Sequence, residues 1–350
     1  MTVRDLPWLV GALAIAWGPV AAPAAADPYA VGNQVTVGSS AGGMLVIDRA
    51  SGTAEITDAT SLRVDALYTH GFNRQGNAFQ AIASGTWEHD DHWSFGAVLG
   101  FAPPSGTAAS LPVHVTAADG STLATGVDLK SRAWSGNGEL SAEYDTGGEG
   151  AASTTYGVAL GARVIGSTQK IIGVTADNGT TTSIDQLRMT CATRGCPPEI
   201  QGLLEKSQTT LGQLQLTGGA TETLWRTTDL DLYATYFAYT EDPLKSGFFS
   251  ASTAGRSEAA SLGLPVAPLR FSVAPALTHR FGRVVSVTAS AQYGRCVDAH
   301  CTTVLTGAKA RFQIGDSWRL TLAVMLQRDA ITGSPIAWSR ATAVGAMYSF

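Results

Sequence analysis

Apolar and polar side chains alternate with a period of two along many segments of this 350-residue chain. The last residues show the pattern clearly, because Phe350, Tyr348, Ala346 and Val344 fall on one face and the residues between them fall on the other. A β-strand produces a period of two, whereas an α-helix has a period near 3.6. The pattern therefore predicts an all-β protein.

Alternating runs bounded by turn residues predict about twelve strands. These are residues 62–69, 79–87, 93–101, 134–144, 154–166, 211–225, 230–239, 268–281, 284–295, 302–314, 318–328 and 336–350. Some connections between them are short, as at residues 89–91 and 315–316, whereas three are long, near residues 103–131, 167–210 and 241–265. Short and long connections alternate along the chain, so each kind should gather at one end of an antiparallel sheet.

Aromatic residues lie near both ends of the predicted strands and share one face. The set near the short turns is Trp87, Trp93, Tyr144, Tyr156, Phe281, Trp318 and Tyr348, and the set near the opposite ends is Tyr68, Phe101, Trp134, Tyr236, Tyr293 and Trp338. Trp134 and Tyr144 are ten residues apart on one strand. At ~3.3 Å per residue and a tilt near 40°, ten residues span roughly 25 Å, the height of the apolar band of a membrane barrel.

The final strand, which ends on Tyr348, Ser349 and Phe350, resembles the closing strand of bacterial outer-membrane β-barrels. The resemblance is to this architecture and not to a single protein. It implies a transmembrane antiparallel β-barrel in the outer membrane of a Gram-negative bacterium, with short periplasmic turns and long extracellular loops. It also implies that Tyr348 and Phe350 form the signal read by the barrel-assembly machinery, and that outer-membrane lipid and lipopolysaccharide surround the wall. Assembly into a homo-oligomer or a larger complex is left open.

The N-terminal residues are typical of a secretory signal. The apolar run from Trp8 to Val20 is too short to span a membrane, and Ala24-Ala25-Ala26 forms an A-x-A site of the kind that signal peptidase cuts. We therefore expect a signal peptide at residues 1–26, an N-terminal segment at residues 27–60 and the barrel at residues 61–350. The N-terminal segment could be a plug, a hairpin or two further strands, and the last case would give fourteen.

Four cysteines lie in two close pairs, Cys191/Cys196 and Cys296/Cys301. An even number in an exported chain favours a disulfide bond within each pair, each closing a small ring in an extracellular loop. A metal site is the competing interpretation, but it would need tighter spacing and would require the two pairs to meet in space. We predict two disulfide bonds, no metal site and no cofactor.

The face opposite the aromatic residues carries polar side chains and should line the lumen. Its charged members are Arg63, Asp65, Glu139, Glu143, Arg163, Asp229, Asp231, Arg270, Lys309, Arg311 and Arg319. Charges within a membrane barrel must pair or contact water. An open lumen would set acids against bases across a small pore, whereas a closed lumen would be filled by paired networks. Small residues on this face, such as Gly157 and Gly161, favour the open lumen.

Candidate chemistry adds little to this interpretation. A net charge of −5 without a basic stripe excludes a nucleic-acid partner. The segment His92-Trp93-Ser94 resembles the H-x-S-N-G motif of outer-membrane phospholipases, but Phe95 stands where that family has asparagine. The sequence therefore predicts a passive channel, or porin, for small polar or charged solutes, and not an enzyme. The alternatives are a structural or interaction barrel that acts through disulfide-stiffened loops as part of a complex, and an outer-membrane lipid hydrolase.

Overall fold

The computed structural model describes residues 29–40, 43–71, 77–116, 122–147, 153–176, 179–194, 207–243, 268–297, 301–331 and 337–350. The predicted signal peptide, residues 1–26, lies outside the described residues. So does Cys196.

The described residues form fifteen strands and one helix. In chain order these are β1 (Tyr29–Ser40), β2 (Gly43–Thr57), β3 (Thr60–Gly71), β4 (Asn77–Glu88), β5 (Trp93–Thr116), β6 (Thr122–Asp145), β7 (Thr154–Thr175), β8 (Thr181–Ser183), α2 (Ile184–Arg194), β9 (Ser207–Trp225), β10 (Thr228–Tyr239), β11 (Leu269–Phe281), β12 (Val285–Cys296), β13 (Cys301–Ile314), β14 (Trp318–Ile331) and β15 (Ala337–Ser349). The antiparallel pairs β1–β15 and β6–β7 close the sheet into a ring. The short strand β8 pairs only with β7, so fourteen strands form the barrel wall.

The all-β barrel is confirmed, with the fourteen strands of the stated alternative and not the twelve first counted. The two additional strands, β1 and β2, come from the segment at residues 27–60 that the sequence analysis set apart from the barrel. β1 closes the wall against the last strand, since Val31 faces Tyr348 in β15. The consecutive small and polar residues Gly32, Asn33 and Gln34 weaken the apolar alternation in β1, so the pattern alone does not predict this strand.

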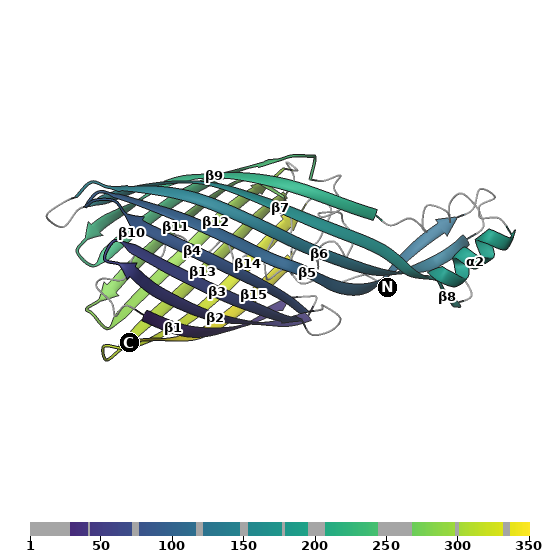
Figure 1. Ribbon diagram of the computed structural model, residues 1–350, viewed down its shortest axis with the longest axis horizontal. Coiled ribbons are helices and arrows are strands. Elements are labelled where there is room, and N and C mark those ends of the chain that lie inside the picture. Colours follow the sequence, from purple (N-terminus) through teal and green to yellow (C-terminus); the bar gives the residue numbers. More distant parts are fainter. Residues whose placement is uncertain are drawn as a thin grey trace.

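The connections separate into two ends of the barrel (Figure 1). The short-turn end carries the turns β2–β3, β4–β5, β9–β10, β11–β12 and β13–β14, together with the end of the chain at Phe350. At the opposite, long-loop end, β5, β6 and β7 project beyond the other strands, and α2 packs against β7 and β8. No described helix is long and apolar enough to cross a membrane.

Two of the predicted long loops contain regular structure, and the first of them is largely strand. β5 continues to Thr116 and β6 begins at Thr122, so most of residues 103–131 form a projecting hairpin. β7 continues to Thr175 and turns back into β8 through Gly179, which has a φ of 79°. Strands that have left the lipid band no longer need apolar alternation on one face, so their outer parts lack the pattern that predicts them.

The outward face of the wall is apolar. Every aromatic residue predicted to face lipid is exposed, from 36% for Tyr144 to 58% for Phe281, and leucines between the two belts are exposed as well, with Leu99 at 68% and Leu140 at 67%. A water-soluble protein would bury most side chains of this kind, whereas a transmembrane barrel presents them to lipid. The predicted division between lipid-facing and lumen-facing positions is therefore confirmed for these residues.

The inward face is apolar toward the long-loop end. Two clusters there form what we call the apolar collar: Ala102, Ala133, Ile165, Leu211, Phe237, Tyr239, Leu269, Cys296 and Cys301. The disulfide bond Cys296–Cys301 lies within it and confirms the predicted pairing. Its predicted position in a loop is wrong, because Cys296 ends β12, Cys301 begins β13, and both are buried. Cys191 belongs to α2, and its predicted partner Cys196 lies outside the described residues.

Candidate functional site

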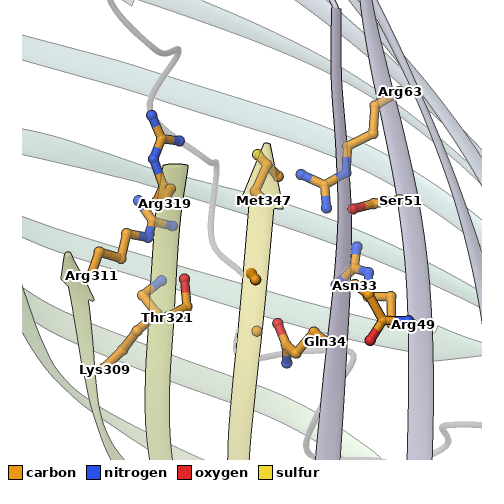
Figure 2. Close-up of a pocket in the computed structure, with 12 residues that line it drawn as sticks. Asn33, Gln34, Arg49, Ser51, Arg63, Lys309, Arg311, Arg319, Thr321 and Met347 are labelled. Atoms are coloured by element: carbon orange, nitrogen blue, oxygen red, sulfur yellow. The ribbon is translucent and has the colours of Figure 1, made fainter. Parts of the chain in front are cut away.

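Toward the short-turn end the inward face becomes charged. A pocket with a volume of about 80 Å³ lies on the lumen wall where the first and last strands meet. Five cationic side chains line this cationic pocket: Arg49, Arg63, Lys309, Arg311 and Arg319. Figure 2 shows them reaching into one space from two sides, from β2 and β3 on one side and from β13 and β14 on the other.

Closure of the barrel brings these side chains together. Arg311 faces Thr321 in β14, and Thr321 faces Gly345 in β15. Across the closing seam, Gly345 faces Gln34 in β1, and Gln34 faces Arg49 in β2. The three residues between the two arginines are small or of moderate size and uncharged, so they leave room for the long cationic side chains to lean over them.

Asp65 is the carboxylate that pairs with two of these cations. It is only 2% exposed, and its Oδ2 lies 2.9 Å from Nη2 of Arg49 and 3.0 Å from Nε of Arg63. Arg311 is close enough to both Arg63 and Arg319 for their like charges to interact. Five cations line the pocket and Asp65 pairs with only two of them, so the pocket carries an excess of positive charge, which favours anions.

Carboxylates lie on the opposite part of the wall. Glu139 and Glu143 belong to β6, and Asp229 and Asp231 belong to β10. In the ring of fourteen strands, β6 and β10 flank the pair β7 and β9, which lies half a turn from the seam between β15 and β1. Lys309 in the cationic pocket is within electrostatic reach of Asp231. The lumen therefore has a positive wall and a negative wall.

Hydrogen bonds hold most of these carboxylates in place on their own wall. Glu139 accepts a hydrogen bond of 2.5 Å from the amide of Gln215, and Asp231 accepts one of 2.7 Å from the hydroxyl of Thr221. Glu143 accepts one from Ser94. Asp229 accepts one of 3.1 Å from Thr223 and forms an ion pair with Arg280. The described contacts thus stabilise the two walls separately.

Two of the predicted lumen residues do not join either group. Arg163 lies in β7 between Asn137 and Gln213 of the adjacent strands. Arg270 is exposed at the start of β11, beside a register shift between Leu269 and Phe271 at the long-loop end.

Arg49 is not among the predicted lumen residues, because residues 27–60 are left open in the sequence between a plug, a hairpin and two further strands. Its signal was present in the alternation of Ile47, Arg49, Ser51 and Thr53, which share one face of β2. Once β2 is placed in the wall, this face points to the lumen, since Arg49 and Ser51 line the cationic pocket.

Glycines on the inward face do not mark open space. A Cβ atom at Gly161 would lie 2.5 Å from Nε2 of Gln215, and one at Gly157 would lie 3.3 Å from Cε1 of Tyr233. These glycines let larger side chains from neighbouring strands lie against the wall. The inference of an open lumen from small residues is therefore wrong at these positions.

His92 and Ser94 do not act on each other. Nδ1 of His92 lies 2.9 Å from the carbonyl oxygen of Asp145, whereas the Ser94 hydroxyl is bonded to Glu143. The turn itself is held by Asp90, which accepts hydrogen bonds from the backbone N–H groups of His92 and Trp93. These two hydrogen bonds hold the pKa of Asp90 below its usual value. Among the described residues, no group of three His, Cys, Asp or Glu side chains could hold a metal ion.

No protein-family model and no curated protein matches this chain. Solved structures do match. One is a CymD monoaromatic hydrocarbon channel, with a TM-score of 0.58 at 10% identity, covering 93% of this chain and 89% of that chain. The shared fold is a membrane β-barrel. The toluene transporter TodX of Pseudomonas putida matches with a TM-score of 0.52 at 10% identity, covering 93% and 90%. A TodX deltaS2S3 mutant matches with a TM-score of 0.53 at 12% identity, covering 93% and 90%. At these identities the likeness establishes the fold alone.

Proposed function

We propose that this protein is a passive channel in the outer membrane of a Gram-negative bacterium, and that it conducts small polar solutes with a preference for anions. The observation that carries the proposal is the cationic pocket, where five positive side chains line the lumen wall and only two of them pair with Asp65. A purely structural barrel would gain nothing from gathering like charges at one point, because like charges repel unless water or anions separate them.

The size of the preference follows from Coulomb's law. At ~5 Å in water, one unit charge changes the energy of a monovalent ion by about 0.8 kcal/mol, which is a factor of about four in local concentration. Several cations acting together would enrich anions further, although salt weakens the effect as the Debye length shrinks. The carboxylates on β6 and β10 leave a path for cations along the other wall, so we expect a preference and not exclusion.

The titles of two similar structures name hydrocarbon channels, and this offers a different class of solute. The inward face here argues against it in the short-turn half, because an apolar solute gains nothing from displacing the water that solvates charged side chains. The apolar collar is the part of the lumen that would suit such a solute. A channel for polar solutes fits the charged half better.

The scaffold alternative is favoured by one feature. β5, β6 and β7 project past the rest of the wall at the long-loop end and carry β8 and α2 (Figure 1). Such a projection could present a binding surface outside the cell. A barrel that acts only through this surface would not need to conduct ions.

Planar-bilayer recording of the purified, refolded protein tests the proposal. We expect discrete conductance steps and, in a KCl gradient at low salt, a reversal potential that shows chloride preference. Arg311→Ala should lower the chloride-to-potassium permeability ratio by about fourfold or more, on the Coulomb estimate above. Arg188→Ala makes the same change of charge on α2, outside the lumen, and should leave the ratio unchanged.

The absence of conductance steps in folded protein would reject the channel and favour the scaffold. Conductance without anion preference, or an equal effect of the two variants, would reject the role of the cationic pocket. Fractionation of membranes after expression with residues 1–26 intact tests the location, since recovery in the inner membrane or the periplasm would contradict it.

A further inference from the structure

Two polar residues lie on the outward face of the wall beside the closing seam. Asn33 in β1 donates a hydrogen bond of 2.7 Å to Oδ1 of Asp48 in β2, and both side chains are exposed. Asp48 is adjacent to Arg49, which points into the lumen, so it must point outward. Asn33 is also among the residues that line the cationic pocket, but alternation sets its side chain on the face of Val31 and Val35, which are 51% and 41% exposed. A carboxylate therefore stands on the surface that faces lipid.

The level of Asp48 within the membrane follows from the register. Tyr348 in the aromatic belt faces Val31 in β1, and Val31 faces Gly52 in β2. Because the strands are tilted near 40°, paired residues on neighbouring strands do not lie at the same depth in the membrane. Each step from β15 to β1 and from β1 to β2 moves the paired residue about one residue toward the long-loop end. Asp48 comes four residues beyond Gly52 in that direction. Asp48 therefore lies about six residues from the aromatic residues near the short turns, measured toward the long-loop end. The apolar band is about ten residues high, so Asp48 lies inside it, where an uncovered charge is costly.

A cationic side chain lies on the other side of β1 on this same outward face. Arg340 in β15 is exposed and comes eight residues from Tyr348. The levels of Arg340 and Asp48 therefore differ by about two residues, or roughly 5 Å, which the length of an arginine side chain spans. The two charges cannot easily meet within one chain, because β1 lies between β15 and β2.

On the other side of the barrel, the described outward positions in the middle of β7 and β9 are apolar. The corresponding outward positions of β7 and β9 are Val158, Leu160, Leu214 and Leu216, which are 52–60% exposed. This is the apolar surface that a membrane barrel presents to lipid. Beside Asp48, in contrast, the outward positions of β2 are the small residues Ala50, Gly52 and Ala54. Among the described residues, nothing lies within 4 Å of a Cβ atom placed at Gly52, so no described contact requires a glycine there.

We propose that two copies of this chain associate through the outward face of β15, β1 and β2, with β1 at a two-fold axis along the membrane normal. Such an axis sets β15 of each copy against β2 of the other. Arg340 of one copy then faces Asp48 of the second copy at nearly the same level, and the contact occurs twice. The small residues of β2 let the two walls approach closely, and the interface removes both charges from lipid.

A second copy fits this surface better than a lipid headgroup does. Lipid phosphates would attract Arg340, but they would repel Asp48 and would not reach the middle of the apolar band. A copy of the same chain brings both charges at matching levels. The symmetric arrangement pairs them without any other protein.

Disulfide cross-linking of the full-length protein in native membranes tests the interface. Val35→Cys places a thiol on the outward face of β1, close to the proposed axis, where it would meet its own copy. Leu160→Cys places an equally exposed thiol on β7, on the far wall, and serves as the matched control. Under mild oxidation we expect dimers from the first variant and not from the second. Equal yields from both variants, or no dimer from Val35→Cys, would overturn the proposal.

The charge pairing is tested within the Val35→Cys variant. Asp48→Asn keeps an acceptor for Asn33 while removing the charge, and it should lower the dimer yield by about tenfold, equivalent to about 1.4 kcal/mol. Arg340→Asp should lower it as well, and the combination of Arg340→Asp with Asp48→Arg should restore it. Only protein that migrates as a folded barrel on unheated gels is counted. Unchanged yields in the single variants, or no recovery in the exchanged pair, would overturn the pairing of Arg340 with Asp48.

Discussion

Replacing Val324 by arginine should destabilise the barrel much more than the same replacement at its neighbour Ala323. Val324 lies in β14, is 54% exposed and faces Ala308 and Thr342 on the adjacent strands. It comes six residues after Trp318, so it lies within the apolar band. Ala323 points to the lumen, where it faces Lys309 and Ala343.

The magnitudes differ because the surroundings differ. An arginine near the middle of the lipid face of a barrel costs roughly 2–4 kcal/mol. At Ala323 the new charge would stand beside Lys309, and at ~5–6 Å in water the repulsion is about 0.7–0.8 kcal/mol. We therefore expect a difference of about 1–3 kcal/mol between the two variants. Ala323→Glu would replace this repulsion by attraction and should be milder than Ala323→Arg.

Reversible unfolding in denaturant, from lipid vesicles and followed by tryptophan fluorescence, measures these free energies. If Ala323→Arg costs as much as Val324→Arg, or more, the register of β14 is shifted by one residue and the assignment of faces fails. If Ala323→Glu is the more damaging of the two changes at this position, the cationic pocket does not act on that part of the lumen.

Further outcomes test other parts of the molecule. Phe350 stacks on Tyr29 with ring centroids 6.1 Å apart, and its backbone N–H donates a hydrogen bond to the carbonyl oxygen of Tyr29. We expect deletion of Phe350 to abolish membrane insertion but not secretion. Normal heat-modifiable migration of the deletion variant would contradict this. Replacing Cys296 and Cys301 by serine opens a small ring worth roughly 2 kcal/mol, so the variant should insert but unfold at lower denaturant, and an unchanged midpoint would reject a stabilising role. Asp90→Ala should weaken the dependence of stability on acidic pH, because the lowered pKa of Asp90 adds stability above pH ~4 that is lost as the pH falls through the folded-state value. Parallel stability curves between about pH 5 and pH 2 would reject that contribution.

The lipid face could be predicted from the sequence because the membrane imposes one rule on every strand. Leu99, Leu140 and Val324 sit where alternation places them, and each is exposed. The same rule fails where lipid does not act, as in β5 beyond Pro103 and Pro104. It also fails where polar residues occupy the outward face, and Asn33 in β1 is such a residue.

The charged site was predictable residue by residue but not as an arrangement. Alternation identifies Arg63, Lys309 and Arg311 as lumen-facing, yet it gives no indication that residues near opposite ends of the chain meet. That information comes from ring closure, which makes β1 and β15 neighbours. Arg270 is a case in which the alternation itself fails. A register shift at the start of β11 interrupts the pairing at this residue, so the alternation that predicts a lumen-facing Arg270 does not hold there.

β2 is the strand on which both proposals depend most directly. Arg49 points into the lumen and pairs with Asp65, while the adjacent Asp48 points outward and pairs with Asn33. A slip of one residue would exchange the two faces, setting a cation in lipid and a carboxylate in the cationic pocket. Such a slip would lose the ion pair inside and the hydrogen bond outside at once. The two adjacent charges of opposite sign therefore fix the register of a strand whose apolar alternation is too weak to do so.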